Sequence, residues 1–280
     1  MKFDPDVRRI LSEKLQVVFA DAEGNLLSEP AENATRYVVL GPVSLPVTLH
    51  GRTHIFQWFC YSRYDGTDES LLDRERLIHS LASTETLPSS VLMMGDLKTA
   101  EAPMIRLHSC CATGDIFGSQ RCECGPQLRR AMQMIADAGA GAVVYLAQHE
   151  GRGIGLFAKA AAYLLQDRGF DTYEANRKLG FPEDSRNFSD AAMMIHLLRG
   201  ANKPIRLISN NPEKKKALEL GGVQVSALVP LVIGLAPYNL RYLQTKRANG
   251  HLFTERDLSR NAENVELVES NRAPRETLHS

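Results

Sequence analysis

Four of the five cysteines in this chain lie in one short polar segment that also contains glycine. Cys111 is followed by Cys122 and Cys124, so three thiols fall within 14 residues. Three thiolates can fill three corners of a zinc tetrahedron and leave the fourth free, which is what a metal needs to activate water. The pattern therefore predicts a catalytic zinc site and hydrolytic chemistry.

The residues alone leave alternatives open. Zinc at these thiols could be structural, or the cysteines could be buried apolar side chains or redox-active thiols that bind no metal. Cys110 could also replace Cys111 as a ligand, because the spacing does not choose between them. Cys60 stands alone between two aromatic residues, and we expect it in the core.

The composition is that of a globular protein with a substantial core, either one large domain or two small ones. The chain has 280 residues, 44% of them hydrophobic, and a formal net charge of zero. This charge balance predicts no nucleic-acid partner, although a nucleotide would need only a local basic pocket. We expect no membrane span and no signal peptide, and hence a cytoplasmic protein, in which clustered thiols bind metal rather than form disulfides.

The chain divides into three expected regions. Residues 1–44 are expected to form an N-terminal extension, with a short helix from Val7 to Leu15 and an apolar run that continues to Ala20. Residues 45–254 are expected to form the catalytic domain, and the polar residues 255–280 a frayed tail. Apolar runs at His54–Cys60 and Val91–Gly95 predict strands, separated by a charged, loop-like segment near residues 65–90.

Helices and strands are predicted to alternate after the thiols. Leu128, Met132 and Ile135 repeat at helical spacing, with Pro126 in the first turn and Gly139 as the stop signal. Two further strand-then-helix pairs follow, at Gly141–Leu146 with Phe157–Arg168 and at Ile205–Ser209 with Glu213–Leu220. This alternation predicts a layered α/β domain.

The loop from Gln148 to Gly155 has the character of a ligand-binding loop. Its glycines let backbone approach a ligand closely, the helix that follows offers free N–H groups, and Arg152 adds further donors. These features suit a phosphate or a purine edge. Alternating glycines are equally common in tight turns, so the loop by itself does not decide.

Other candidate residues have ordinary explanations as well as functional ones. Asp184 and Arg186, two apart in a loop, are typical of a solvated ion pair. Ser209 and Lys214 flank a strand-to-helix junction that could bind phosphate oxygens or be only a helix cap beside a solvated lysine. Tyr163, on an Ala- and Leu-rich helix, could be a core tyrosine.

Six segments in order resemble the motifs of the GTP cyclohydrolase II family. They are Arg106–Asp115, Arg121–Gly125, Gln148–Leu156, Asp171–Asn176, Asp184–Arg186 and Ser209–Lys214. The resemblance runs from about Leu45 to Phe253, with an added segment near residues 65–90. It implies a layered α/β/α fold with a mixed β-sheet, and the N-terminal extension lies outside it.

The resemblance also implies roles for individual residues. Cys111, Cys122 and Cys124 would bind one catalytic zinc ion per subunit, with Cys110 near the substrate. Asp184 would be the proton acceptor, Arg186 a nucleophile toward the α-phosphorus, and Tyr163 a residue near the purine that assists ring opening. The GTP contacts would be Arg106, Leu107, His108, Ser109, Cys110, Gln127, Glu150, Gly151, Arg152, Thr172, Ser209 and Lys214.

The implied reaction is hydrolytic opening of the guanine imidazole ring of GTP, in riboflavin biosynthesis. Formate and pyrophosphate would leave, giving 2,5-diamino-6-ribosylamino-4(3H)-pyrimidinone 5′-phosphate, with Mg²⁺ bound to the triphosphate and a homodimer as the assembly. Because guanidinium stays protonated, we favour an electrostatic role for Arg186.

Some positions depart from the family pattern, and two alternatives follow. Cys110 stands where the family has Glu, Gln148 and His149 where it has Arg-Gln, and Ser209 where it has Thr. A paralogue that acts on GTP or a related nucleotide in uracil catabolism or secondary metabolism, with a different product, is one alternative. A non-catalytic nucleotide-binding protein with structural zinc is the other.

Overall fold

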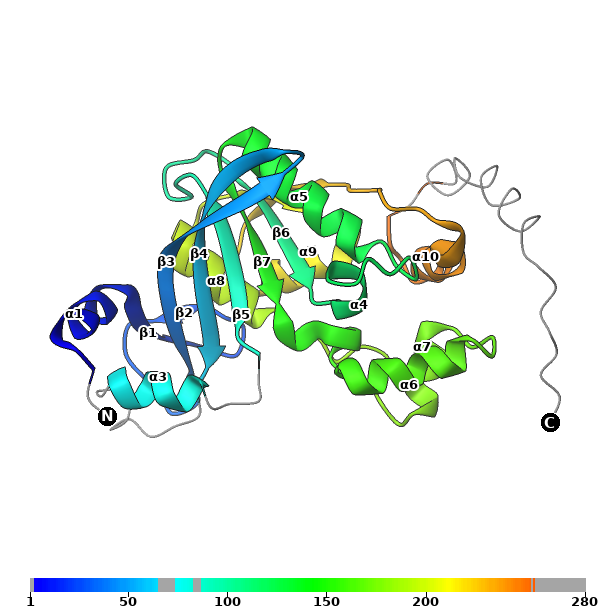
Figure 1. The fold of residues 1–280 in the computed structure, drawn as a ribbon, viewed down its shortest axis with the longest axis horizontal. Coiled ribbons are helices and arrows are strands. Elements are labelled where there is room, and N and C mark those ends of the chain that lie inside the picture. Colours follow the sequence, from blue (N-terminus) through cyan, green and yellow to red (C-terminus); the bar gives the residue numbers. More distant parts are fainter. Residues whose placement is uncertain (1–2, 65–73, 83–86, 253, 255–280) are drawn as a thin grey trace.

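The computed structural model describes residues 3–64, 74–82, 87–252 and 254. Within these residues the strands form one mixed sheet of nine strands, in the order β2-β1-β3-β4-β5-β7-β6-β8-β9 (Figure 1). Their bounds are β1 Leu15–Ala20, β2 Leu26–Leu27, β3 Thr35–Leu49, β4 Arg52–Arg63, β5 Ser89–Met94, β6 Met104–Ser109, β7 Gly141–Leu146, β8 Ile205–Ile208 and β9 Val225–Val229.

One half of the sheet is antiparallel. Each neighbouring pair from β2 to β5 runs antiparallel, and β5 then joins β7 in the same sense. The long hairpin of β3 and β4 closes at His50 and Gly51, which both have positive φ. That pair of conformations matches the right-handed twist of the flanking strands.

The other half, β7-β6-β8-β9, is parallel. Parallel strands end at the same edge of a sheet, so the segments that follow β6, β7 and β8 emerge side by side. These segments contain the motifs at Arg106–Asp115, Gln148–Leu156 and Ser209–Lys214. The topology therefore brings together motifs that are far apart in the sequence.

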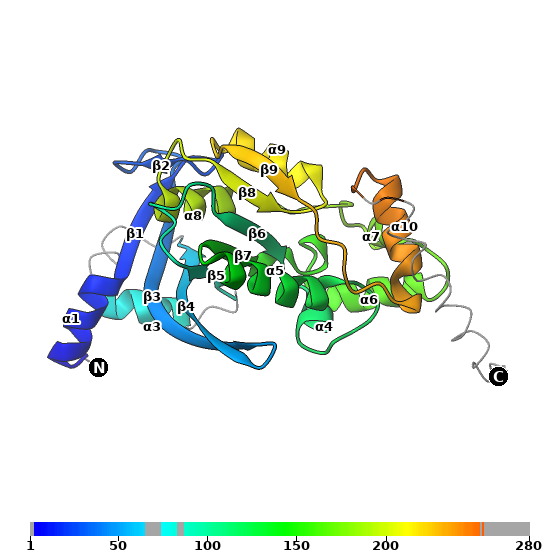
Figure 2. The same ribbon diagram turned by 90° about the horizontal axis from the view of Figure 1, so that it is seen from above.

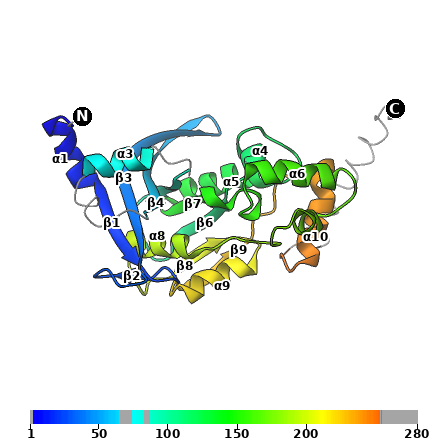
Figure 3. The same ribbon diagram turned by 90° about the horizontal axis from the view of Figure 1, so that it is seen from below.

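Helices cover both faces of the sheet, which confirms the predicted α/β layering (Figures 2 and 3). Ala131, Met132 and Ile135 of α5 pack on one face, in a core that includes Val143 of β7. Residues of α8 pack on the other face, where the neighbouring Val144 points. The helices are α1 Pro5–Lys14, α3 Arg74–Ala82, α4 Ala112–Asp115, α5 Cys124–Ala138, α6 Leu156–Gln166, α7 Thr172–Lys178, α8 Ser189–Arg199, α9 Pro212–Leu220 and α10 Leu240–Ala248, with 3-10 turns η1 Ala147–Arg152 and η2 Pro237–Asn239.

The predicted helix after the thiols is confirmed as α5, which ends at Gly139 in the left-handed conformation. The apolar run of the N-terminal region is β1, and it pairs with β3 in the main sheet. The expected boundary at residue 44 lies inside β3. Parts of the segment near 65–90 and all of the tail 255–280 lie outside the described residues.

Residues 74–82 of that segment form α3, whose Leu77 is fully buried against Leu15, Val38 and Tyr64. Within the described residues, no helix combines the length and the apolar character needed to cross a membrane.

Candidate active site

A cavity of about 140 Å³ lies at the edge of the sheet where the parallel strands end. The segments after β6, β7 and β8 line it, together with side chains from α6, α7 and α10. Leu107 and Asp184 are the two predicted site residues that do not line this cavity. All the other predicted site residues do. They are Arg106, His108, Ser109, Cys110, Cys111, Cys122, Cys124, Gln127, Glu150, Gly151, Arg152, Tyr163, Thr172, Arg186, Ser209 and Lys214.

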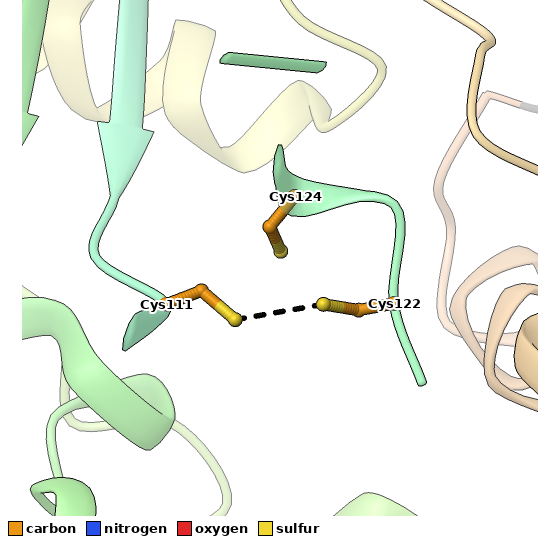
Figure 4. A group of neighbouring side chains, drawn as sticks. All are labelled: Cys111, Cys122 and Cys124. Atoms are coloured by element: carbon orange, nitrogen blue, oxygen red, sulfur yellow. Dashed lines mark hydrogen bonds between the residues drawn. The ribbon is translucent and has the colours of Figure 1, made fainter. Parts of the chain in front are cut away.

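Cys111, Cys122 and Cys124 bring their sulfurs together at the cavity wall (Figure 4). The Sγ atoms of Cys111 and Cys122 are 3.5 Å apart, and all three sulfurs lie within 4.8 Å of one another. With Zn–S bonds of about 2.3 Å, a tetrahedral zinc holds its sulfurs about 3.8 Å apart. The three sulfurs therefore have the chemistry and the spacing to hold one zinc ion.

Gly114 makes room for this cluster. A Cβ atom at this position would lie 3.0 Å from the sulfur of Cys122 and 3.2 Å from that of Cys111. Both distances are shorter than ordinary van der Waals contacts to sulfur. A side chain here would press into the cluster, and the sulfurs would have to shift by a few tenths of an ångström to admit it.

Cys110 is separate from the sulfur cluster. Its Sγ accepts a hydrogen bond from the Tyr145 hydroxyl at 3.2 Å and faces Glu150 Oε2 at 3.7 Å. Burial raises the pKa of its thiol to about 11. The geometry thus groups Cys111, not Cys110, with Cys122 and Cys124.

Lys159 links the sulfur cluster to Glu150. Its buried ammonium donates to Cys111 Sγ at 3.2 Å and to Glu150 Oε1 at 2.6 Å. Burial opposes this charge, but the sulfur of Cys111 and the carboxylate of Glu150 raise the pKa of Lys159. Hydrogen bonds from Cys122 and Cys124, aided by the charge of Lys159, hold the pKa of Cys111 well below its usual range.

Glu150 is fixed by several donors and acts as a rigid acceptor. Ala112 N–H donates to its Oε2 at 2.6 Å and Gly151 N–H to its Oε1 at 3.0 Å. Gly151 has φ +60, and a Cβ there would lie 2.9 Å from Ile154. The predicted ligand loop therefore uses this glycine for its conformation and for close packing.

A second buried carboxylate organises the start of the thiol loop. Asp115 accepts from Cys111 N–H and from the Tyr145 hydroxyl, each at 3.0 Å, and pairs with His108 Nε2 at the same distance. Burial lowers the pKa of His108 despite Asp115. His108 Nδ1 has no hydrogen-bond partner among the described residues, and His108 lines the cavity.

Arg186 reaches the cavity from the loop before α8. Its guanidinium hydrogen-bonds both carboxylate oxygens of Asp184, at 2.8 and 2.5 Å, and donates to Ser109 Oγ at 3.3 Å. Burial opposes ionisation of Asp184, but the hydrogen bond and charge of Arg186 lower its pKa. The side chain of Arg186 is 13% exposed and that of Asp184 is 37% exposed, so the guanidinium is largely shielded from water while the carboxylate is partly open to it.

Lys214 lies at the start of α9 and is buried. Its ammonium donates to the carbonyl of Leu107 at 2.8 Å. Burial, followed by repulsion from Arg106 and Arg186, holds its pKa well below the ordinary value. An anion among these cations would relieve their repulsion, so this end of the cavity is suited to phosphate.

Tyr163 and Thr172 complete the wall on the α6–α7 side. The Tyr163 hydroxyl is 3.2 Å from Thr113 Oγ1, beside the sulfur cluster, and Arg121 covers its ring at 4.6 Å. Burial raises the pKa of Tyr163, so its hydroxyl keeps its proton. Its role as a core tyrosine is excluded by its place on the cavity wall.

The sequence prediction missed several lining residues. His149, Glu123 and Lys159 belong to segments already singled out, and a lone lysine among alanines on α6 was an available signal. Tyr242 and Lys246 of α10 belong to no recognisable motif, and no local pattern marked them.

Comparison with known proteins places the chain in a family. The family model described as GTP cyclohydrolase II matches residues 78–230. GTP cyclohydrolase-2 of Streptomyces coelicolor is 44% identical over 200 residues, which cover 71% of this chain and 79% of that protein.

Riboflavin biosynthesis protein RibBA of Aquifex aeolicus is 47% identical over 176 residues, which cover 62% of this chain and 42% of that protein. RibBA of Cytophaga hutchinsonii is 48% identical over 167 residues, which cover 59% and 40%. The chain thus aligns with less than half the length of these two RibBA proteins. Because the family model matches more than half of the chain, this protein belongs to the GTP cyclohydrolase II family of hydrolases.

Proposed function

We propose that this protein opens the imidazole ring of GTP by hydrolysis. The products are formate, pyrophosphate and 2,5-diamino-6-ribosylamino-4(3H)-pyrimidinone 5′-phosphate. The observation that carries the proposal is one cavity that joins a three-sulfur cluster to a group of buried cations. The sulfur cluster suits the guanine ring, and the cations suit the triphosphate.

Cys111, Cys122 and Cys124 are the proposed ligands of one zinc ion per subunit. Thiolates are preferred by zinc over magnesium or calcium, and the spacing of these sulfurs fits a zinc tetrahedron. When bound there, zinc supplies Lewis-acid activation of the water that attacks C8 of guanine. Lys159 offsets part of the negative charge of the three thiolates through its contact with Cys111.

Glu150 and Tyr163 are the proposed contacts at the guanine end. Glu150 is held in place by Lys159 and by two backbone N–H groups, so it can orient a donor of the base without moving. Tyr163 keeps its proton and lies beside the sulfur cluster, where it can donate to a ring nitrogen as the ring opens. The remaining proposed substrate contacts that line the cavity are Arg106, His108, Ser109, Cys110, Gln127 and Gly151.

Arg186, Lys214 and Ser209 are the proposed contacts at the phosphate end, with Mg²⁺ bound to the triphosphate. Arg186 stabilises negative charge on the phosphate oxygens, because a guanidinium is always protonated. Asp184 orients this guanidinium through two hydrogen bonds and is the proposed proton acceptor. Arg152 and Thr172 also line the cavity.

The pathway and compartment follow from the relatives and from the thiols. Two relatives are named for riboflavin biosynthesis, and we propose that pathway for this chain. The cytoplasm is the proposed compartment, since a three-thiol metal site requires reduced cysteines.

A homodimer is the proposed assembly, in line with the family resemblance. Phe157 and Leu164 on α6 are 93% and 68% exposed, and Phe117, which follows α4, is 75% exposed. Large apolar side chains that form one exposed patch mark interaction surfaces, and we propose that these three lie in the subunit interface. Phe157→Glu should lower the mass of the assembly in light scattering, and an unchanged dimer would place the interface elsewhere.

The direct test is incubation of the zinc-loaded protein with GTP and Mg²⁺. We expect equimolar formate and pyrophosphate, and mass analysis should find the diaminopyrimidinone phosphate. ATP is the matched control substrate and should stay intact. A different nucleotide product would favour a paralogue with another pathway, for which the Cys110 side of the pocket is the first place to look. Intact GTP with one zinc bound would refute the proposal.

A further inference from the structure

Helix α10 lies outside the stretch matched by the family model, yet it forms part of the cavity wall. Leu243 anchors the helix and is 1% exposed, against Val232 and Leu235. Beyond the helix, the N–H of Leu252 donates to the carbonyl of Asn210 at 2.8 Å. Helix α10 is therefore held against the rest of the domain by its buried side and by the segment that follows it.

The segment before α10 passes very close to the start of α5. Gly234 has φ +77, and a Cβ at this position would lie 2.8 Å from Pro126 and 3.4 Å from the Cβ of Glu123. Only glycine allows this approach without strain. The close passage brings α10 against the loop that carries two of the three clustered thiols.

Lys246 of α10 forms an ion pair with Glu123, the residue between Cys122 and Cys124. Its Nζ lies 2.5 Å from Glu123 Oε1. The side chain of Glu123 is 2% exposed and that of Lys246 is 13% exposed. Two residues 123 positions apart are thus paired with little exposure to water, at a residue that lies between two of the proposed metal ligands.

Glu123 needs a positive partner because of where it lies. A buried carboxylate between two thiolate ligands is repelled by both, and the other groups near it compensate only in part. Gln127 Nε2 donates weakly to Glu123 Oε1 at 3.5 Å. The Oε1 atom of Gln127 accepts a hydrogen bond from Arg106 at 2.7 Å. Oε2 of Glu123 has no hydrogen-bond partner among the described residues. Loss of Lys246 would leave a buried, unpaired charge beside the thiols.

We propose that Lys246 is a positioning residue for the thiol loop, and that α10 is therefore part of the catalytic centre. The ion pair holds Glu123, and Glu123 sets the backbone that presents Cys122 and Cys124. Through Gln127 the same contacts extend to Arg106, a proposed substrate contact. The inference rests on the proposed function, since it assumes zinc at the three thiols.

The test compares zinc release in a set of variants, with thermal melts to check folding. The variants are Lys246→Met, Lys246→Arg, Glu123→Gln, the double variant Lys246→Met/Glu123→Gln and the control Lys216→Met. Lys216 is an exposed lysine on α9 that pairs loosely with Glu213 at 3.9 Å. The zinc-loaded proteins are mixed with a chromophoric chelator, and the rate of release is measured with GTP turnover alongside.

Lys246→Met should release zinc about 10–100-fold faster than the parent, which is the usual effect of losing a contact to a metal ligand shell. Lys246→Arg should stay within a few-fold of the parent, and Lys216→Met should match it. In the Glu123→Gln background, Lys246→Met should have almost no further effect, because no carboxylate is left to compensate.

Equal release from Lys246→Met and Lys216→Met would overturn the inference. So would an effect of Lys246→Met that is undiminished in the Glu123→Gln background, or failure of both Lys246→Met proteins to fold, which would make the helix purely structural. A parent that binds no zinc or leaves GTP intact would instead refute the proposed function. If the parent binds zinc and turns over GTP, the Lys246 comparison is decisive.

Discussion

The two halves of the sheet are similarly buried but differ in what they carry. Strands β1 to β5 contribute Tyr37, Val39 and Val91 to the core, and none of the described residues before Arg106 lines the cavity. Strands of the parallel half contribute to the same core. The site lies at the edge of the sheet where the carboxyl ends of these strands meet. Parallel strands gather their following loops at one edge, whereas antiparallel strands send alternate loops to opposite edges.

The first way to sharpen this contrast is to remove a thiol from each half. Cys122→Ser should abolish zinc binding and lower formate release by more than the roughly 100-fold that loss of an outer contact costs. Cys60→Ser, in β4, is the matched control and should retain both. Metal analysis and a formate assay on the two purified variants measure this. Normal formate release by Cys122→Ser would remove the basis for the metal site.

The second prediction separates the two ends of the cavity. Arg186→Gln should lower the rate of pyrophosphate release by about 10²–10³-fold, because one positioned donor to a charged transition state is lost. Arg177→Gln is the control, since Arg177 forms an exposed ion pair with Glu183. Formate and pyrophosphate are followed separately. If the variant changed only KM, Arg186 would bind substrate without stabilising the transition state.

The third prediction concerns the acid stability of the site half. Burial, and then the charge of Arg186, lower the pKa of His149 to about 4, against an ordinary value of about 6.5. The unfolded chain then binds the extra proton, so the contribution of this residue to stability is complete above about pH 6.5. It is lost as the pH falls toward 4, by about 3 kcal/mol in total.

His149→Gln removes this titration. Urea unfolding of the metal-free parent and variant at pH 7 and pH 4.5 should show the parent losing about 2–3 kcal/mol more than the variant over that range. The other histidines contribute equally to both proteins and cancel. Parallel pH dependences would mean that His149 is not kept neutral by the fold.

The smallest effect is expected from matched truncations in the two cores. Val39→Ala in β3 and Val144→Ala in β7 each remove a side chain that is 1% exposed. Each should lower the free energy of unfolding by about 2 kcal/mol, from lost burial and the cavity left behind. Only Val144→Ala should also change KM for GTP, by a few-fold, because β7 leads into Glu150. Equal kinetic effects would mean that the halves are less independent than the topology indicates.

Much of the site was predictable because its residues lie in short local patterns. The thiol spacing, the glycine loop and the helix after the thiols needed only neighbouring residues, and each lies where the sequence indicated. The choice between Cys110 and Cys111 was not local. It depends on Glu150 and Tyr145, which reach Cys110 from the strand and loop beside it.

Other features could not be read from the sequence for the same reason. Strand β6 contains Arg106 and His108, which break an apolar pattern although both are buried. Their partners are a carbonyl in β8, Gln127 in α5 and Asp115 in α4. Lys246 was missed because its partner, Glu123, is 123 residues away. Buried polar residues are explained by contacts that form only in the folded chain.

The backbone at Gly114 has a consequence for how the protein can change over time. It has no side chain to react with, yet a Cβ atom at this position would lie against two sulfurs. Even a single added methyl would compete for volume with whatever those sulfurs hold. A position without chemistry of its own therefore limits the space around the sulfurs, and a survey of reactive side chains would pass over it.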